Sequence, residues 1–264
     1  MIRFWMPVGT LLLALAGLAA LLPDPLLITP DRLAPPTLMH PFGTDQLGRD
    51  EAARVIAALP GSLGLALAGL AAGVMIALLT SLPAAWLEGR VAGRVLDGAA
   101  QALLSFPPLW LPLVILALAG RGAGAQIVCI ALVLWADLHW VLRGEARRIL
   151  GEPFVESARS LGFGPAAILA RDVLPNLAGP LLWLGLLKMR AAVVLLATLA
   201  FLGLGAPPPA PSWGGMVAEA RDWFLDAPWL LGAPTAAIAA SLLGAASLAT
   251  LLHARLGLAR SGFR

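Results

Sequence analysis

The sequence predicts an all-α polytopic membrane protein with about six transmembrane helices. Of its 264 residues, 59% are hydrophobic and only 12% are charged, and the mean hydropathy is +0.87. An ordinary soluble domain carries about 25% charged residues, and a soluble fold of this composition would expose a large apolar surface. Apolar stretches long enough to cross a bilayer recur along the chain. Together these observations argue strongly against a soluble enzyme.

Six apolar stretches have the length of a membrane span. They lie at about residues 4–22, 62–82, 99–119, 123–142, 177–204 and 228–252. We interpret the first as an uncleaved span, because the apolar core of a cleaved signal peptide is shorter. The third contains Pro107, Pro108 and Pro112, so we expect a kinked or broken helix there.

The distribution of arginine predicts the orientation of these spans. With the N-terminus inside, the inner segments contain 11 arginines and the outer segments five. Cytoplasmic segments carry the excess of basic residues in membrane proteins, so both termini are predicted to lie inside. Three segments are too polar to be spans, and we expect function there. They are the outer residues 23–60, the inner loop 143–176 and the outer residues 205–227.

Several function classes lack their sequence signals. No basic run with interleaved aromatic residues points to nucleic acid, and the single cysteine, Cys129, permits neither an intramolecular disulfide nor a cysteine-based metal cluster. The chain has no Gly-x-x-x-x-Gly-Lys-Ser/Thr phosphate loop, and its only lysine, Lys188, lies in an apolar stretch. It has neither His-Glu-x-x-His nor Gly-x-Ser-x-Gly, which argues against an intramembrane enzyme. We therefore expect no catalytic residue, metal or cofactor in this chain.

The inner loop is predicted to contain two short helices. Pro153 suits the first turn of a helix that Gly162 stops. A second helix is predicted over about 166–173, with Leu174-Pro175-Asn176 ending it.

The first of these helices has a small apolar face. Phe154, Ala158 and Leu161 fall on that face at helical spacing, and Arg159 points elsewhere. The face packs either against the protein's own helix ends or the lipid surface, or into a groove of a cytoplasmic partner. The residues alone leave both open.

The same loop resembles the EAA loop of ABC importer permeases. The family pattern is Glu-Ala-Ala, three residues, Gly, nine residues, then Ile-x-Leu-Pro, and the spacing here matches throughout. The matching residues are Glu156, Ser157, Ala158, Gly162, Leu174 and Pro175. Two positions depart from the pattern, because Ser157 replaces Ala and Asp172 replaces Ile. The resemblance implies coupling helices that sit in a cleft of an ATP-binding subunit.

Further motifs resemble the second permease subunit of dipeptide, oligopeptide and nickel importers. The stretch from His40 to Asp50 is similar to the HPxGTDxxGRD motif of that group. Other matching stretches follow in family order: Ser105-Phe106-Pro107, Phe201-Leu202-Gly203-Leu204-Gly205, Pro211-Ser212-Trp213-Gly214, Glu219-Ala220-Arg221-Asp222 and Ala227-Pro228-Trp229. The resemblance implies the type I ABC importer permease architecture. We divide the chain into residues 1–60, with the first helix and a periplasmic segment, and a core permease domain over 61–264.

The outer motif offers a second group of candidate residues: Gly43, Thr44, Asp45, Gly48, Arg49 and Asp50. The glycines permit tight turns, and the charged residues can pair and cap the approach to the second span. Either they form local ion pairs only, or they build a periplasmic rim that meets a substrate-binding protein. We interpret Trp213, Trp223 and Trp229 as an interfacial aromatic belt.

Four ionisable residues within the spans are candidates for lining a pathway. Asp137 and His139 lie two residues apart and so point to different helix faces, which argues against a joint metal or proton site. They line the path or contact a partner helix. Lys188 and Arg190 either snorkel to the inner surface or face a central cavity shared with a partner permease.

The resemblance implies an inner-membrane permease subunit of an ATP-driven importer. Its expected partners are a second related permease in a heterodimer, two ATP-binding subunits that hold ATP and Mg²⁺, membrane lipid, and a periplasmic or lipid-anchored substrate-binding protein. The expected cargo is a di- or oligopeptide, with nickel or a metal–metallophore complex as the alternative. An ion-driven secondary transporter is the alternative class. It should show inverted repeats, and none is evident.

Overall fold

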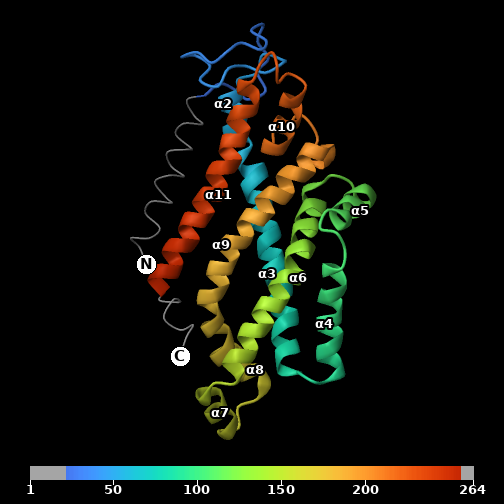
Figure 1. Cartoon of the computed structure of the whole chain (residues 1–264), viewed down its shortest axis with the longest axis vertical. Coiled ribbons are helices and arrows are strands. Elements are labelled where there is room, and N and C mark those ends of the chain that lie inside the picture. The colour runs from blue at the N-terminus through green and yellow to red at the C-terminus, as the bar shows by residue number, and fades with distance from the viewer. Residues whose placement is uncertain (1–21, 257–264) are drawn as a thin grey trace. The chain divides into compact units, whose positions relative to one another are not determined.

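The computed structural model describes residues 22–256 and is built from helices (Figure 1). Within this part of the chain no strand forms, and one isolated antiparallel bridge joins Thr44 to Asp50. Except for Leu22, the predicted first span lies outside the described residues.

The described helices follow one another with short connections. They are α2 (Glu51–Ala57), α3 (Leu65–Trp86), α4 (Val91–Leu104), α5 (Trp110–Ala119), α6 (Ala123–Leu150), α7 (Pro153–Ser160), α8 (Pro165–Ile168), α9 (Leu174–Leu199), α10 (Trp213–Arg221) and α11 (Trp229–Leu256). Three π-helical turns interrupt or extend them: η1 (Pro60–Gly64), η2 (Leu169–Val173) and η3 (Ala200–Leu204).

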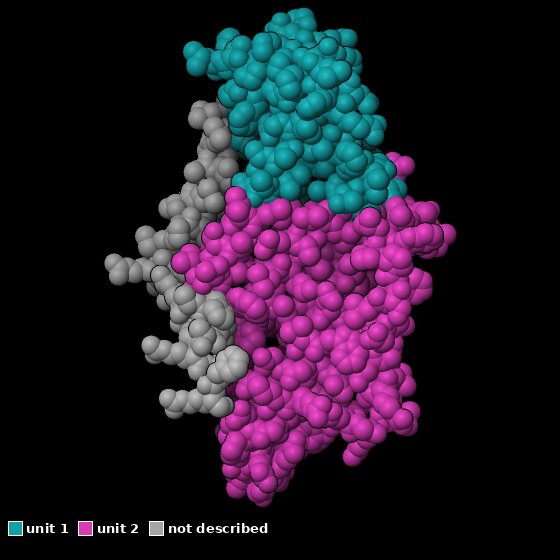
Figure 2. All heavy atoms as spheres, in the orientation of Figure 1, with its two compact units in different colours: residues 1–64, 196–240 teal, residues 65–195, 241–264 magenta. Residues whose placement is uncertain are grey.

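Contacts divide the chain into two compact units (Figure 2). Unit 1 contains residues 1–64 and 196–240, and unit 2 contains residues 65–195 and 241–264. Unit 1 therefore carries the outer polar segments, and unit 2 carries α3 to α8 and most of α9.

Among the described residues, four helical runs are long and apolar enough to cross a membrane. They are Glu51–Trp86, Ala123–Leu150, Pro165–Leu204 and Trp229–Leu252. The predicted span at 99–119 is broken, as its prolines led us to expect. There α4 ends at Leu104 and α5 begins at Trp110, with Pro107 and Pro108 between them.

Unit 2 is organised around α3 and α6, which run side by side (Figure 1). Two glycines of α3 permit the close approach. A Cβ atom at Gly69 would lie 2.5 Å from the Cβ of Ile130, and one at Gly73 would lie 2.9 Å from the carbonyl oxygen of Ala131. In a membrane, where the hydrophobic effect does not drive helix association, small residues allow the dispersion contacts that hold helices together.

The inner end of unit 2 departs from the sequence prediction in one respect. Leu174-Pro175-Asn176 does not end a helix, because η2 continues directly into α9. The amide of Leu174 bonds to the carbonyl of Leu169, five residues earlier, so the turn is wider than an α-helical one. Pro175 has no amide hydrogen and so needs no acceptor in the preceding turn. As the second residue of α9 it follows this wide turn without breaking the helix.

Unit 1 has its own small core. Val55, Ala58, Trp213, Met216 and Ala233 are buried together. The indole Nε1 of Trp213 donates to the carbonyl of Val55 at 3.0 Å. For Trp213 the interpretation as an interfacial belt residue is therefore wrong, because its polar edge is satisfied inside the protein.

Replacing Gly69 by valine tests the α3–α6 contact. We expect the variant to be destabilised by about 1–3 kcal/mol, the usual cost of overpacking a close contact. Thermal unfolding in detergent measures the effect. The matched control is Gly98→Val on α4, where a Cβ atom meets no heavy atom within 4 Å. Equal melting temperatures for the two variants would contradict the close-packing account.

Candidate functional site

The inner loop is fixed to unit 2 by one side chain of α7. Val155 is fully buried and joins a core that includes Ala146, Ile149, Ile168 and Val173. Ala158 packs at the edge of this core. The sequence analysis did not identify Val155 as a core residue. Val155 lies off the helix face that Phe154, Ala158 and Leu161 define.

The predicted face of α7 is largely exposed. The side chains of Phe154 and Leu161 are 46% and 78% exposed, and Glu156 and Ser157 also lie on the surface. Within the described part of the chain, Phe154 and Leu161 are therefore left uncovered, whereas Ala158 of the same face packs on the inner core. Of the two interpretations, packing against the chain's own helix ends accounts for Ala158 alone, and the lipid surface and a groove of a cytoplasmic partner both remain open for Phe154 and Leu161.

One further contact and one glycine shape the loop. The guanidinium of Arg159 lies 5.0 Å from the ring centre of Trp86, at the end of α3, a distance at which a cation is attracted to the ring face. Gly162 has a φ of +85°, a backbone conformation that glycine adopts without strain. It ends α7, as predicted, whereas Leu174 and Pro175 begin α9.

The outer motif forms a buried network in unit 1. The Oδ2 atom of Asp45 accepts from Arg49 Nε at 2.6 Å and also from Arg54 Nη1. Both arginines reach Oε2 of Glu219, Arg54 at 2.9 Å and Arg49 at 3.4 Å. The predicted pairing of Asp45 with Arg49 is thus present. Arg54 and Glu219 also belong to the network. The sequence analysis did not predict them, because both lie outside the motif 40–50.

The rest of the motif shapes the start of α2. Asp50 is the N-cap, and its Oδ1 accepts from the amide of Ala53 at 2.7 Å. His40 Nδ1 lies 2.8 Å from the other carboxylate oxygen of Asp50. The hydroxyl of Thr44 donates to the carbonyl of Asp31 and accepts from the amide of Ala34.

The two glycines of the motif are required by their surroundings. Gly43 and Gly48 both have positive φ angles. A Cβ atom at Gly48 would lie 2.1 Å from the carbonyl oxygen of Thr29, and one at Gly43 would lie 2.5 Å from that of Ala34. All six candidate residues of the motif are buried, so they build the scaffold of a surface and do not themselves form it.

Asp137 and His139 belong to separate sites, as their spacing predicted. Asp137 of α6 pairs with Lys188 of α9, with Oδ2 and Nζ 2.7 Å apart. Both residues lie within predicted spans, so the ammonium group of Lys188 has a partner inside the span. Arg190, two residues along α9, is exposed.

His139 is fully buried in a polar network that joins three helices of unit 2. Its Nδ1 lies 2.9 Å from Oγ1 of Thr80 on α3, and its Nε2 lies 3.1 Å from Oδ1 of Asp97 on α4. Arg143 Nε lies 2.8 Å from the same oxygen of Asp97. The network ties α4 to the α3–α6 pair, and this role needs no substrate.

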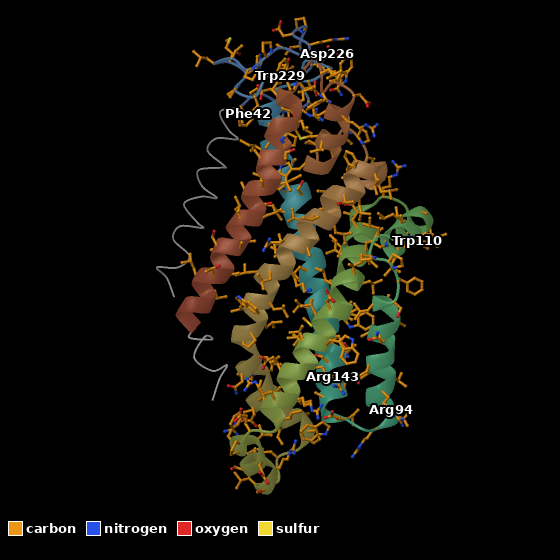
Figure 3. The ribbon with its side chains drawn as sticks, in the orientation of Figure 1. Phe42, Arg94, Trp110, Arg143, Asp226 and Trp229 are labelled. Atoms are coloured by element: carbon orange, nitrogen blue, oxygen red, sulfur yellow. The ribbon has the colours of Figure 1, made fainter. Side chains whose placement is uncertain are left out.

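Labelled side chains show the polarity of unit 2 (Figure 3). Arg94 and Arg143 lie toward one end of the unit, and Trp110 toward the other. Arg147 and Arg148 lie in the last turn of α6, beyond the predicted span end at about 142. Arginines therefore gather at the end that carries α7 (Figure 1), which agrees with the predicted cytoplasmic side.

Comparison with known proteins identifies the family of this chain. The family described as "Binding-protein-dependent transport system inner membrane component" matches residues 69–258. The chain belongs to this family. It is a permease subunit of an ABC importer, located in the bacterial inner membrane, and it is a transport subunit and not an enzyme.

Two curated relatives and one solved structure resemble this permease. A peptide transport system permease protein of Brucella suis biovar 1 is 34% identical over 80% of this chain and 71% of the relative. The glutathione transport system permease protein GsiD of Escherichia coli is 33% identical over 77% of this chain and 67% of the relative. A chain of the inward-facing MetNI methionine ABC transporter superposes with a TM-score of 0.62 at 14% identity, covering 75% of the permease and 96% of that chain. This structural likeness shows the fold alone.

Replacing Arg54 by leucine tests the outer network of the permease. The change leaves the buried carboxylate of Asp45 with one cationic partner fewer. Breaking a buried ion pair on one side costs about 3–5 kcal/mol, so we expect a large loss of thermal stability in detergent. Arg221→Leu is the matched control, because Arg221 pairs with Asp222 at an exposed site, where ion pairs contribute about 0–1 kcal/mol. Similar melting temperatures for both variants would refute a structural role for the network.

Proposed function

We propose that this permease and a second, related permease together form the path of a peptide importer. Two ATP-binding subunits, which hold ATP and Mg²⁺, complete the complex on the inner side. A periplasmic or lipid-anchored substrate-binding protein delivers the cargo on the outer side. The family as a whole works with ATP-binding and substrate-binding partners, and the stoichiometry of this complex is our proposal.

The observation that carries the proposal is the arrangement of α7. One side chain, Val155, is locked into the inner core of unit 2, while Phe154, Glu156 and Leu161 remain exposed. A short helix fixed on one side and open on the other suits a docking element. Glu156, Ser157 and Ala158 begin the EAA-like pattern there, and we assign this surface to the ATP-binding subunit.

Coupling then follows from the contacts of the loop. Closure of the ATP-binding subunits displaces α7, and the buried Val155 passes this movement to Ile149 and Ala146 of α6. The contact of Arg159 with Trp86 passes it to α3. Because packed helices move as rigid elements, a small shift of α7 reorients the α3–α6 pair. The path opens alternately to the two sides of the membrane.

We propose peptides as the cargo because both curated relatives point to them. One is named for peptide transport and the other for glutathione, itself a tripeptide. The alternative of nickel or a metal–metallophore complex gains no support from these names. The described residues also include no group of three or more His, Cys, Asp or Glu side chains placed to hold a metal ion.

The outer motif has a proposed role as the support of a periplasmic rim. Its charged residues satisfy one another inside unit 1, so we do not assign them to direct cargo contact. Instead they hold the neighbouring segment in one shape. Exposed apolar side chains of that segment include Leu38, Met39 and Phe42. We assign this surface to contact with the substrate-binding protein.

Co-purification tests the assembly. The tagged permease is expressed with its neighbouring genes, purified in detergent and examined by mass spectrometry, with peptide and metal analysis of bound material. We expect a second permease and an ATP-binding subunit to accompany it. A permease that purifies alone and transports in vesicles without ATP would overturn the proposal and favour an ion-driven transporter.

Replacing Gly162 by valine tests the coupling role. Its φ of +85° is strained for valine, and such strain costs about 1–3 kcal/mol, so α7 should lose its docking geometry. We expect import to fall about tenfold or more while the complex still assembles and hydrolyses ATP.

Gly164→Val is the matched control for this prediction. Gly164 lies two residues away with a φ of −75° and has open space around it, so valine fits there without strain. Normal import by Gly162→Val, or equal loss in both variants, would contradict the coupling role.

A further inference from the structure

The ion pair of Asp137 and Lys188 lies at an unusual depth. Asp137 is the fifteenth of 28 residues in α6, and Lys188 is the fifteenth of 26 in α9. Both are therefore about 16–21 Å from either end of their helices, at a rise of 1.5 Å per residue. In the predicted spans 123–142 and 177–204, Asp137 is five residues and Lys188 eleven residues from the inner end, so the pair lies within the hydrocarbon core, about 30 Å thick, on its inner side.

The pair is not closed off by the chain. The side chain of Asp137 is 51% exposed and that of Lys188 is 22% exposed. Half-exposed charges within a span are costly against lipid and usually face a water-filled cavity or a protein partner. By contrast, His139 of the same unit is buried, and Asp97 is its partner. Helix packing explains that contact, but it does not explain why Asp137 and Lys188 are left exposed.

An apolar cavity is lined in part by Asp137. It has a volume of about 250 Å³, and its lining includes Leu103, Phe106, Leu111, Val133, Asp137 and Ala191. Asp137 is the charged side chain of this lining. The volume equals that of roughly eight water molecules at about 30 Å³ each, which is enough for one side chain such as that of leucine. The site thus combines an apolar hollow with a carboxylate and, beyond it, an ammonium group.

We propose that the cavity and the Asp137–Lys188 pair form a transit site for the amino-terminal end of a peptide. The peptide's ammonium group binds Asp137, its first side chain enters the cavity, and its carbonyl or carboxylate oxygens face Lys188. This inference rests on the proposed function and names the part of the path that holds the cargo.

Charge complementarity favours a zwitterionic occupant. When the peptide enters, Asp137 exchanges the ammonium of Lys188 for that of the peptide, and Lys188 gains oxygen acceptors. No buried charge is left without a partner during the exchange. When the peptide leaves, the internal pair re-forms. Because the internal pair competes with the cargo, binding remains weak enough for release, as a conducting path requires.

Cysteine accessibility tests whether the site is open to water. The single cysteine, Cys129, is buried, so a Cys129→Ala background carries the test variant Ala191→Cys at the edge of the cavity. Leu182→Cys is the control. It lies on the same helix, is also exposed, and is nine residues away, so at 3.6 residues per turn it faces the opposite side.

The assembled complex is treated with a cationic methanethiosulfonate reagent, at rest and during ATP turnover. We expect position 191 to react about tenfold faster than position 182, as water access to a cavity but not to lipid implies. A millimolar mixture of Leu-Ala, Phe-Ala and Leu-Gly-Gly should slow the reaction. The same peptides with acetylated amino termini should not. No reaction at position 191 in either state would overturn the proposal in favour of a partner or lipid contact.

Charge variants separate cargo contact from a structural role. Asp137→Asn, Lys188→Met and the exchange Asp137→Lys with Lys188→Asp are compared for import of the same peptides. We expect each to lower import by about tenfold or more, because each removes a charge-assisted contact or reverses it. The exchanged pair keeps the internal attraction but puts an ammonium group beside the cavity, where it repels the peptide. Restoration of import by the exchange would overturn the proposal.

The two proposals fail in distinguishable ways. If the unaltered complex imports no peptide, the proposed function fails whatever the variants do. If the unaltered complex imports peptides and all three charge variants import them equally well, only the transit site fails. Loss of the complex in Asp137→Asn and Lys188→Met, with recovery in the exchanged pair, would assign the pair to assembly and also overturn the transit site.

Discussion

Unit 2 depends on the close approach of α3 and α6, which Gly69 and Gly73 make possible. Side chains larger than hydrogen at these positions would collide with Ile130 and with the backbone at Ala131. Since lipid is as apolar as a leucine side chain, this contact gains its stability from dispersion and fit. The bond between Thr80 of α3 and His139 of α6 requires the same approach, and His139 in turn holds Asp97 of α4.

The inner end of the same pair holds the proposed coupling loop in place. Ala85 of α3 and Ala146 of α6 share a core with Val155 of α7, and Arg159 rests on Trp86, the last residue of α3. A loop of small helices at the end of a bundle would otherwise have few contacts and open easily. Here a buried valine ties it to the inner ends of α3 and α6, so on the proposed coupling role a force on α7 acts on this helix pair.

Sequence reasoning reached the fold class, the proline break near Pro107, the helix start at Pro153 and the pairing of Asp45 with Arg49. These features depend on neighbours in the chain or on composition. It failed where distant segments decide the outcome. Trp213 is buried because Val55 accepts from it, Arg54 meets Glu219 across 165 positions, and a wide helical turn carries the chain through Pro175. No local pattern contains that information.

Two polar groups near the middle of α6, two residues apart, differ in how far unit 2 encloses them. His139 is enclosed, with both ring nitrogens near a partner. Asp137 has one partner, Lys188, and is half exposed. The helices that bury His139 could bury Asp137 in the same way, yet they leave it half exposed. Since an exposed charge at this depth is costly, its persistence next to an apolar cavity is best explained by what passes the site, which is why we assign the pair to cargo.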